Sequence, residues 1–226
     1  DSSKNQDQNE TNSQKKDDKV INATIGLDTS PVYLAPSSVQ VNPSTGTASS
    51  SVPISVPPGR GGIQPSIALV YNSTLSNGIV GVGWALEFGS IERSTKKGTP
   101  KYDDNLDTFV FSQSGSGEEL VFDTGAGFYR PKTEGAFMKI EHITNGQNRW
   151  LVTDKKGTKY YFGQTDASRQ FNPDSGSILF KWMLDRVEDI NGNYMTFSYL
   201  KDGNQLYPQY IDYTGNAVQG SSPFNH

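Results

Sequence analysis

Residues 178–195, ILFKWMLDRVEDINGNYM, decide the fold. Large apolar residues recur at every second position of the first half: Ile178, Phe180, Trp182 and Leu184. Lys181 and Asp185 take the opposite face, and this period of two predicts a long strand. A helix is the alternative, because no proline interrupts the stretch. The aromatic content and the Asn-Gly pair that follows favour the strand.

The same stretch contains a turn motif that occurs three times. The motif reads D-x-x-G at Asp154–Gly157, Asp189–Gly192 and Asp212–Gly215. A type I turn takes Asp at its first position and Gly at its fourth, so we interpret the three aspartates as turn caps rather than as catalytic residues or metal ligands. With a loop over 190–192, Val187 falls opposite Met195 and Arg186 opposite Thr196, and Gly192 closes a bulge.

Outward from this hairpin, turn signals recur every eight to twelve residues or so, which predicts an all-β fold of antiparallel strands and hairpins: a sandwich, a barrel or an open meander sheet. The run around Pro53 predicts an edge strand. Pro57-Pro-Gly59-Arg60-Gly61-Gly62 predicts a turn. Further strands are predicted at 67–71, 84–88, 108–111, 119–122, 127–130, 137–143, 150–153 and 159–162.

Composition divides the chain into three parts. Residues 1–19 contain no large apolar side chain, and we expect a disordered polar leader. Residues 20–47 form a transitional segment with three prolines, and residues 48–226 form the β domain. The first residue is Asp1 rather than Met, from which we expect a trimmed or processed chain.

Charge and composition exclude several functional classes. The net charge is −4, so no basic field is available for a nucleic-acid backbone. The chain has no cysteine, which excludes disulfides and thiolate sites. No stretch approaches the ~18 consecutive apolar residues of a membrane-spanning helix.

Several long linear motifs resemble the N-terminal segment of the SpvB family (Salmonella virulence plasmid B protein), which also opens the B component of insecticidal Tc toxins. The motifs are VPISVPPGRGGIQPSIALVYNS at 52–73, GIVGVGWAL at 78–86, IERSTKKGTPKYDD at 91–104, YRP at 129–131 and DINGN at 189–193. They cover about residues 48–216 in the order of the family. The D-x-x-G hairpins also resemble the YD units of RHS-repeat proteins.

The resemblance implies a role in assembly rather than a reaction. In Tc toxins this segment belongs to a β-rich shell that encloses a toxic polypeptide, and in the Salmonella protein the ADP-ribosylating activity belongs to a separate C-terminal domain. The resemblance therefore implies partners among downstream RHS or propeller segments or other toxin subunits. It also implies a protein that is secreted, extracellular or on the bacterial surface, with a cytoplasmic location before export as the alternative. The chain stops at His226, before any propeller or repeat array, so we expect a fragment or a stand-alone relative.

Candidate chemistry is sparse. Asp103, Asn105 and Asp107 alternate like the first ligands of a calcium loop, but the glycine and closing glutamate of an EF-hand are missing. A looser Ca²⁺ site and a solvated acidic turn both remain open, and no other cofactor is expected. A Ser-His-Asp triad would depend on His142, and no G-x-S-x-G elbow is present. Neighbours in a strand face opposite ways, so Glu141 and His142 do not form a dyad.

Other candidates are weighed in the same way. The glycines of residues 78–83 precede a predicted strand rather than a helix, so a close backbone crossing beneath Trp84 is favoured over a phosphate cradle. Arg60 is a charged turn tip or a contact for an anionic partner. A glycosidase needs two facing carboxylates, for which four glutamates are available: Glu87, Glu92, Glu134 and Glu188. Surface aromatics of the last third serve a docking or sugar-stacking face if they are exposed.

The leading hypothesis is a non-catalytic structural or interaction domain of a toxin-type protein. The alternative is a secreted carbohydrate-binding or adhesion module, and a glycoside hydrolase comes third.

Overall fold

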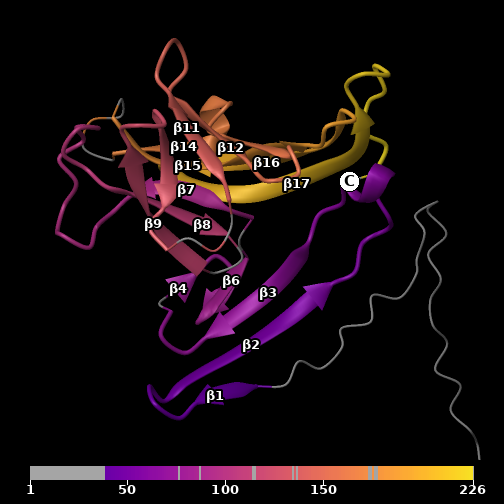
Figure 1. Ribbon diagram of the computed structural model, residues 1–226. Helices are drawn as coiled ribbons and strands as arrows, with labels where there is room; N and C mark the ends of the chain where they lie inside the picture. The colour runs from indigo at the N-terminus through magenta and orange to yellow at the C-terminus, as the bar shows by residue number, and fades with distance from the viewer. Residues whose placement is uncertain are drawn as a thin grey trace, which may run out of the picture. The chain divides into compact units, whose positions relative to one another are not determined.

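The computed structural model describes residues 39–225 except 76, 87, 114–115, 134, 136, 173–174 and 176–177. These residues form seventeen β-strands and two short 3-10 turns, η1 (Arg60–Gly62) and η2 (Asp166–Ser168), in two larger sheets and one two-stranded hairpin (Figure 1). The all-β prediction is confirmed. The predicted leader lies outside the described residues. None of the described elements is a helix with the length and apolar character needed to cross a bilayer.

The smaller sheet has four antiparallel strands in the order β1 (Gln40–Asn42), β2 (Thr47–Ile54), β3 (Ile67–Asn72) and β6 (Trp84–Leu86). Its first strand begins at Gln40, before the predicted start of the domain at residue 48. Pro53 pairs with Ala68 of β3, whereas β1 pairs only with residues 47–49 of β2. Among the described residues, no strand lies beside β2 on one side at Pro53, which suits a residue without an N–H group.

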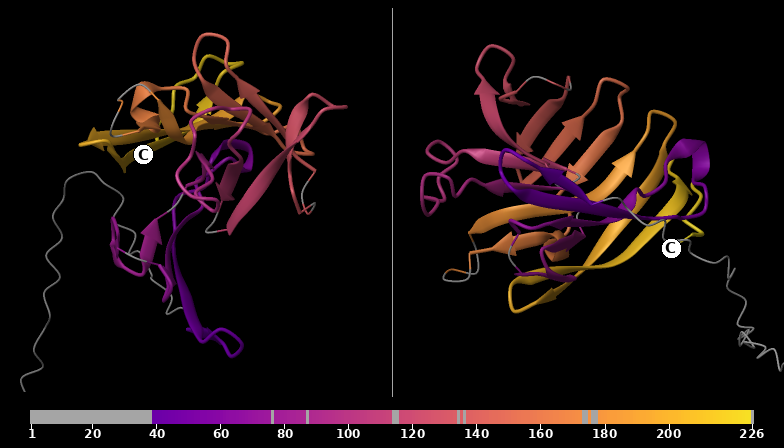
Figure 2. Two further views of the ribbon diagram at one scale, coloured as in Figure 1. Left: turned by 90° about the vertical axis from the view of Figure 1, so that its left-hand side faces the viewer. Right: turned by 90° about the horizontal axis from the view of Figure 1, so that it is seen from below.

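The larger sheet has eleven strands (Figure 2). They are β7 (Ser90–Arg93), β8 (Phe109–Gln113), β9 (Ser116–Asp123), β10 (Phe128–Pro131), β11 (Lys139–Ile143), β12 (Arg149–Thr153), β13 (Lys159–Phe162), β14 (Arg169–Phe171), β15 (Leu179–Glu188), β16 (Asn193–Asp202) and β17 (Gln205–Asn216). From β7 to β13, each strand pairs antiparallel with the next one along the chain.

The long strand β15 closes this series into an eight-stranded ring. Its residues 181–183 pair with β7, and its residues 184–188 pair with β13. The same strand also pairs with β14 and with β16, which pairs in turn with β17. Thus β15 belongs both to the closed ring and to the open sheet of β15, β16 and β17.

The core lies inside the ring because the register brings inward-facing residues opposite one another. Ile91 pairs with Phe111 on one side and with Trp182 on the other, and Trp150 pairs with Phe162. All five are buried. The ring centroids of Phe109 and Trp150 are 4.8 Å apart, and those of Trp150 and Trp182 are 5.9 Å apart. Aromatic side chains of this size fill the interior of an eight-stranded ring and leave a packed core.

Candidate functional site

Two of the D-x-x-G motifs are turns closed by the aspartate carboxylate. At the corner before β13, Asp154 Oδ1 accepts the N–H groups of Lys156 (2.8 Å) and Thr158 (3.0 Å). At the corner between β15 and β16, Asp189 Oδ1 accepts those of Asn191 and Asn193, both at 2.8 Å. The closing glycines Gly157 and Gly192 have positive φ angles, 82° and 77°. The predicted register, Val187 opposite Met195 and Arg186 opposite Thr196, is confirmed.

The third motif is not a turn, which corrects the prediction. Asp212 and Gly215 both lie inside β17, where Asp212 pairs with Thr196 and Gly215 with Tyr194. The register between β16 and β17 shifts here, so the motif forms a β-bulge. Thr214 rather than Gly215 takes the positive φ, 77°. Gly215 is required for space instead, because a Cβ at this position would overlap the ring of Tyr194.

The Pro-Pro-Gly-Arg-Gly-Gly segment packs against the end of the open sheet. Gly61 (φ 61°) lies so close to Asn193 that a Cβ would stand 2.5 Å from its Nδ2, and Gly62 also has a positive φ of 81°. At Gly59 a Cβ would collide with the carbonyl of Ile63. Arg60 donates from Nη1 to Gln219 Oε1 at 2.7 Å, so the guanidinium has a partner within the chain.

The glycine-rich stretch 78–83 forms the hairpin of β4 (Asn77–Gly78) and β5 (Gly81–Val82) rather than the entrance to a helix. A Cβ at Gly78 would overlap the carbonyl oxygen of Trp84, so the backbone does cross closely at this tryptophan. The Trp84 ring is half-buried and packs at 5.3 Å between centroids against Tyr71 of the neighbouring strand β3.

The candidate calcium loop is held in place by the buried guanidinium group of Arg93. Arg93, whose side chain is 4% exposed, donates from Nη1 to Asp107 (2.9 Å) and from Nη2 to Asp104 (2.6 Å). Asp107 also accepts the N–H groups of Lys101 and Tyr102, both at 2.7 Å. Asp103 Oδ1 instead accepts the backbone N–H of Asn105 at 2.9 Å. The alternative of a solvated acidic turn is therefore wrong for Asp107, whose side chain is 6% exposed.

No group of three or more Asp, Glu, His or Cys side chains within the described ranges is placed to share a metal ion. The strand β7, which supplies Arg93, was missed in the sequence. Arg93 stands between Glu92 and Ser94, and a charged residue between polar neighbours does not produce the alternation of apolar residues that predicts a strand.

His142 lies in the ring interior and has a packing role. Its ring stacks on Trp150 with a centroid distance of 4.0 Å, and Nε2 lies 2.8 Å from Asn148 Oδ1. Burial lowers the pKa of His142, against opposing effects of Asn148 and Asp104, and so disfavours an ion pair across the 3.7 Å between His142 Nδ1 and Asp104 Oδ2. Glu141 points the other way and pairs with Lys139 at 2.8 Å, as the alternation predicted.

The carboxylates offer no described pair suited to glycoside hydrolysis. Glu92 pairs with Lys181 at 2.9 Å, and Glu188 pairs with Arg186 at 2.8 Å. Glu87 and Glu134 lie outside the described residues. The buried Asp185, which was not among the sequence candidates, accepts the N–H of Gln164 (2.5 Å) and the hydroxyl of Thr165 (2.8 Å). Burial raises the pKa of Asp185, and the hydrogen bonds that its carboxylate accepts hold the loop that contains η2.

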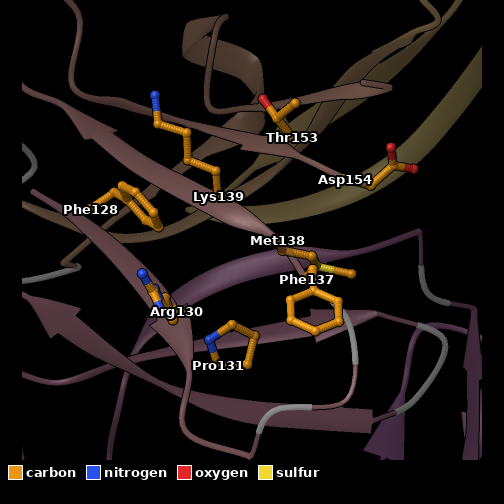
Figure 3. Close-up of a pocket in the computed structure, with 8 residues that line it drawn as sticks. All are labelled: Phe128, Arg130, Pro131, Phe137, Met138, Lys139, Thr153 and Asp154. Carbon is orange, nitrogen blue, oxygen red and sulfur yellow. The ribbon is translucent and has the colours of Figure 1, made fainter. Parts of the chain in front are cut away.

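A pocket of about 350 Å³ opens on the outside of the ring between β10 and β11 (Figure 3). Phe128, Arg130 and Pro131 line one side, and Phe137 and Met138 line the other. Its cations already have carboxylate partners, since Arg130 pairs with Asp123 at 2.9 Å and Lys139 with Glu141. Both cations of this pocket are therefore held in ion pairs, and Thr153 and Asp154 complete its lining.

The aromatic residues of the last third divide between core and surface. Phe162, Phe197, Tyr199 and Tyr213 are buried. Tyr207 and Tyr210 of β17 are 37% and 57% exposed, and they pair across the strands with Leu200 and Ser198. Leu200 of β16 is also exposed, at 53%, so the apolar surface of the open sheet lies on both strands of the β16–β17 hairpin.

Comparisons with known proteins agree on one family. The family model described as "Salmonella virulence plasmid 65kDa B protein" (SpvB) matches residues 42–219. The mono(ADP-ribosyl)transferases SpvB of Salmonella choleraesuis and Salmonella typhimurium are 30% and 29% identical over 199 residues. These alignments cover 76% of this chain but only 32% of each relative, so the chain spans about a third of their length.

Solved structures have the same fold. The N-terminal domain of the effector protein SpvB from Salmonella typhimurium matches with a TM-score of 0.60 and 26% identity, over 74% of this chain and 62% of that one. The crystal structure of TcdB2-TccC3 matches with a TM-score of 0.68 and 23% identity, over 83% of this chain and 11% of that one. The family model covers most of the described strands, and the chain therefore belongs to the SpvB family.

Proposed function

We propose that this chain is a non-catalytic structural and interaction domain of a toxin-type protein, and that it contributes part of the wall of a β-rich shell around a toxic polypeptide. One observation carries the proposal: β15 is shared between a ring with a packed interior and an open sheet that continues into β16 and β17. A closed ring is rigid, and an open sheet can be extended strand by strand.

The side chains support a role without catalysis. The buried polar groups Arg93, Asp107, His142 and Asp185 are engaged with partners inside the chain. They hold the local structure in place: Asp185 accepts the hydroxyl of Thr165 in the loop that contains η2, and His142 stacks on Trp150. The ADP-ribosyl transfer named in the curated relatives then belongs to the two thirds of their length that this chain does not span.

A segment exchange tests the proposal. Residues 42–219 would replace the corresponding segment of TcdB2 in a complex with TccC3, and shell closure would be read as protection of the enclosed polypeptide from added protease. We expect protection in the exchange protein and its loss when Trp182→Asp disrupts the ring. Equal protection after outright deletion of the segment would refute a role in the wall.

A second assay tests the absence of catalysis. The isolated chain would be incubated with labelled NAD and a mixture of acceptor proteins, with a full-length SpvB relative as the positive control. We expect no transferred label from the isolated chain, and transfer above the level without protein would contradict the proposal.

A further inference from the structure

The interior of the ring opens into a pocket at one of its ends. On β8, Gln113 stands two residues after the buried Phe111, and on β13, Tyr160 stands two residues before the buried Phe162. The rings of Phe111 and Phe162 meet inside the ring, with centroids 5.9 Å apart. Because every second residue of a strand faces the same way, Gln113 and Tyr160 form the next layer of the interior. At this layer a pocket of about 340 Å³ begins.

The floor of this pocket is apolar. It combines Leu184 and Val187 of β15 with Met195 and Phe197 of β16 and with Phe88, which precedes β7. The rings of Phe88 and Phe197 pack with their centroids 5.5 Å apart. An eight-stranded barrel is wide enough to hold one small ligand, and the mouth of a barrel is a common place for such a site. The floor therefore has the composition and the position of a small-molecule site.

The connection between β2 and β3 forms another side of the pocket, through Ile63 and Gln64. This connection contains η1 and reaches the end of β17 (Figure 1). The hydroxyl of Tyr213 donates to the carbonyl of Pro57 at 3.2 Å, and the N–H of Gly59 donates to Gln64 Oε1 at 3.1 Å. Together with the guanidinium contact described above, these bonds fix the connection in place. The pocket is therefore a built part of the fold.

The polar lining of the pocket carries one carboxylate and one ammonium group, from Asp154 and Lys156. The carboxylate of Asp154 accepts the N–H groups of Lys156 and Thr158 and the hydroxyl of Tyr160. Its charge is thus engaged by three donors of the chain itself. Lys156 is exposed and forms no ion pair within the part of the chain that the structure describes. The rim of the pocket therefore presents an uncompensated positive charge.

We propose that this pocket binds a small amphipathic anion, a molecule with an apolar body and a carboxylate or sulfonate head. The body lies against the floor, on Phe88, Met195 and Phe197, and the head faces the ammonium group of Lys156. The hydroxyl of Thr158 is a further hydrogen-bond donor at the rim. The net charge of −4 opposes non-specific attraction of anions, so affinity must come from this local arrangement. The site is additional to the proposed role in a shell wall and does not depend on it.

Two matched fluorescent probes test the pocket in the complete chain. Anilinonaphthalene sulfonate carries apolar rings and an anionic head, and phenylnaphthylamine has the same rings without the charge. We expect saturable binding of the sulfonate at one site per chain, and its displacement by decanoate. Lys156→Met should weaken binding of the sulfonate by about fivefold or more, since a hydrogen-bonded charge partner is lost, and should leave binding of the uncharged probe nearly unchanged.

A second variant tests the place of binding. Ser66 is exposed and lines the pocket, so Ser66→Trp adds an indole ring there and should weaken the binding of both probes. The matched controls are Ser51→Trp and Lys132→Met, at exposed positions outside the lining, which should bind both probes as the parent does. Urea unfolding of every variant identifies any loss of binding that comes from a loss of the fold.

Three outcomes would overturn the proposal. The first is the absence of saturable binding of the sulfonate to the parent. The second is binding that Ser66→Trp leaves unchanged, because the probe would then lie elsewhere on the protein. The third is an equal effect of Lys156→Met on the charged and the uncharged probe, because the anionic head would then have no role in recognition.

Discussion

Arg93 shows how a single charged residue determines local structure in this fold. Its guanidinium lies in the core beside the rings of Phe109 (5.2 Å) and Trp182 (5.8 Å) and pairs with two aspartates of the loop before β8. A charge buried this deeply is tolerated only when it is paired and hydrogen-bonded. Arg93 therefore fixes the path of residues 101–107 over the end of the ring.

Replacing Arg93 by Met should destabilise the protein by about 3–5 kcal/mol, because the buried Asp107 carboxylate would lose its cation. Urea unfolding followed by tryptophan fluorescence measures the change. The matched control is Lys132→Met, which breaks a 3.6 Å ion pair with a 62% exposed lysine and should cost ~1 kcal/mol or less. Equal losses of unfolding free energy in the two variants would show that the buried ion pairs of Arg93 contribute no more to stability than an exposed one.

Asp189 should make stability depend on pH. Burial raises the pKa of this carboxyl, but hydrogen bonds from Asn193 and Asn191 outweigh it and hold the pKa below its ordinary value of 3.8. The folded state therefore binds this proton less tightly than the unfolded state. The contribution of Asp189 is fully present above pH 3.8 and is lost as the pH falls through the folded pKa.

Asp189→Ala should cost about 1–2 kcal/mol at neutral pH, since the hydrogen bonds that close the turn are lost. The difference from the parent should shrink as the pH falls below 3.8, which unfolding curves across a pH series would measure. Asp202→Ala, at an exposed position, is the control and should change stability less than Asp189→Ala at neutral pH. A loss at Asp189 that is constant with pH would contradict the carboxylate's role.

At the scale of elements, the D-x-x-G corner is the recurring unit. Gly192 closes the corner between β15 and β16 with a φ of 77°, and a Cβ there would stand 2.7 Å from Val218 Cγ2. Gly146 has a similar φ of 83° but has nothing within 4 Å of the position of a Cβ. Alanine substitutions at the two positions therefore distinguish two contributions to the loss of stability. Gly146 reports only the strain of the backbone conformation, and Gly192 reports that strain plus the overlap with Val218.

Gly146→Ala should cost about 1–2 kcal/mol, which is the price of a left-handed backbone for a residue with a Cβ. Gly192→Ala should cost more, because Val218 must also move. Thermal unfolding of both variants gives the comparison. Similar losses of stability in the two variants would mean that the segment after β17, which contains Val218, can shift to accommodate the added Cβ at no measurable cost.

The sequence predicted those elements whose signal is local. The alternation of Phe180, Trp182 and Leu184 and the capped turn at Asp189 specify β15, its partner strand and their register. The strand β7 was missed because nothing in its sequence, Ser-Ile-Glu-Arg, indicates that Arg93 is buried. That burial depends on ion-pair partners that lie elsewhere in the chain. The Asp212 motif was misread because the same letters form a turn at a chain reversal and a bulge within a strand, and only pairing with β16 distinguishes them.

At the scale of the whole described fold, closure of the ring was beyond the reach of sequence patterns. Each strand from β8 to β13 was predicted individually, but the contact between β13 and β15 and that between β7 and β15 depend on how far the sheet curls. Curling is a property of accumulated twist and of the aromatic volume inside. The sequence specified the strands and left their closure open.

Trp182→Ala should destabilise the protein by about 3–5 kcal/mol, because it removes a fully buried ring that contacts both Trp150 and Phe109. Since β15 is shared, protection from hydrogen exchange should fall together in β7, β13 and β16 rather than near residue 182 alone. Val121→Ala, at a 48% exposed position on β9, should change stability by ~0.5 kcal/mol or less. Loss of protection confined to β15 would show that the ring and the open sheet unfold separately.

The shared strand also governs how the fold would respond to a mechanical pull. Tension entering through the hairpin of β16 and β17 reaches β15, whose backbone is bonded to strands of the ring along most of its length. Antiparallel strands drawn along their own axes resist as many hydrogen bonds breaking at once, whereas strands peeled from an end yield one bond at a time. A hairpin anchored in this way can transmit force from a neighbouring segment into the ring as a single stiff body.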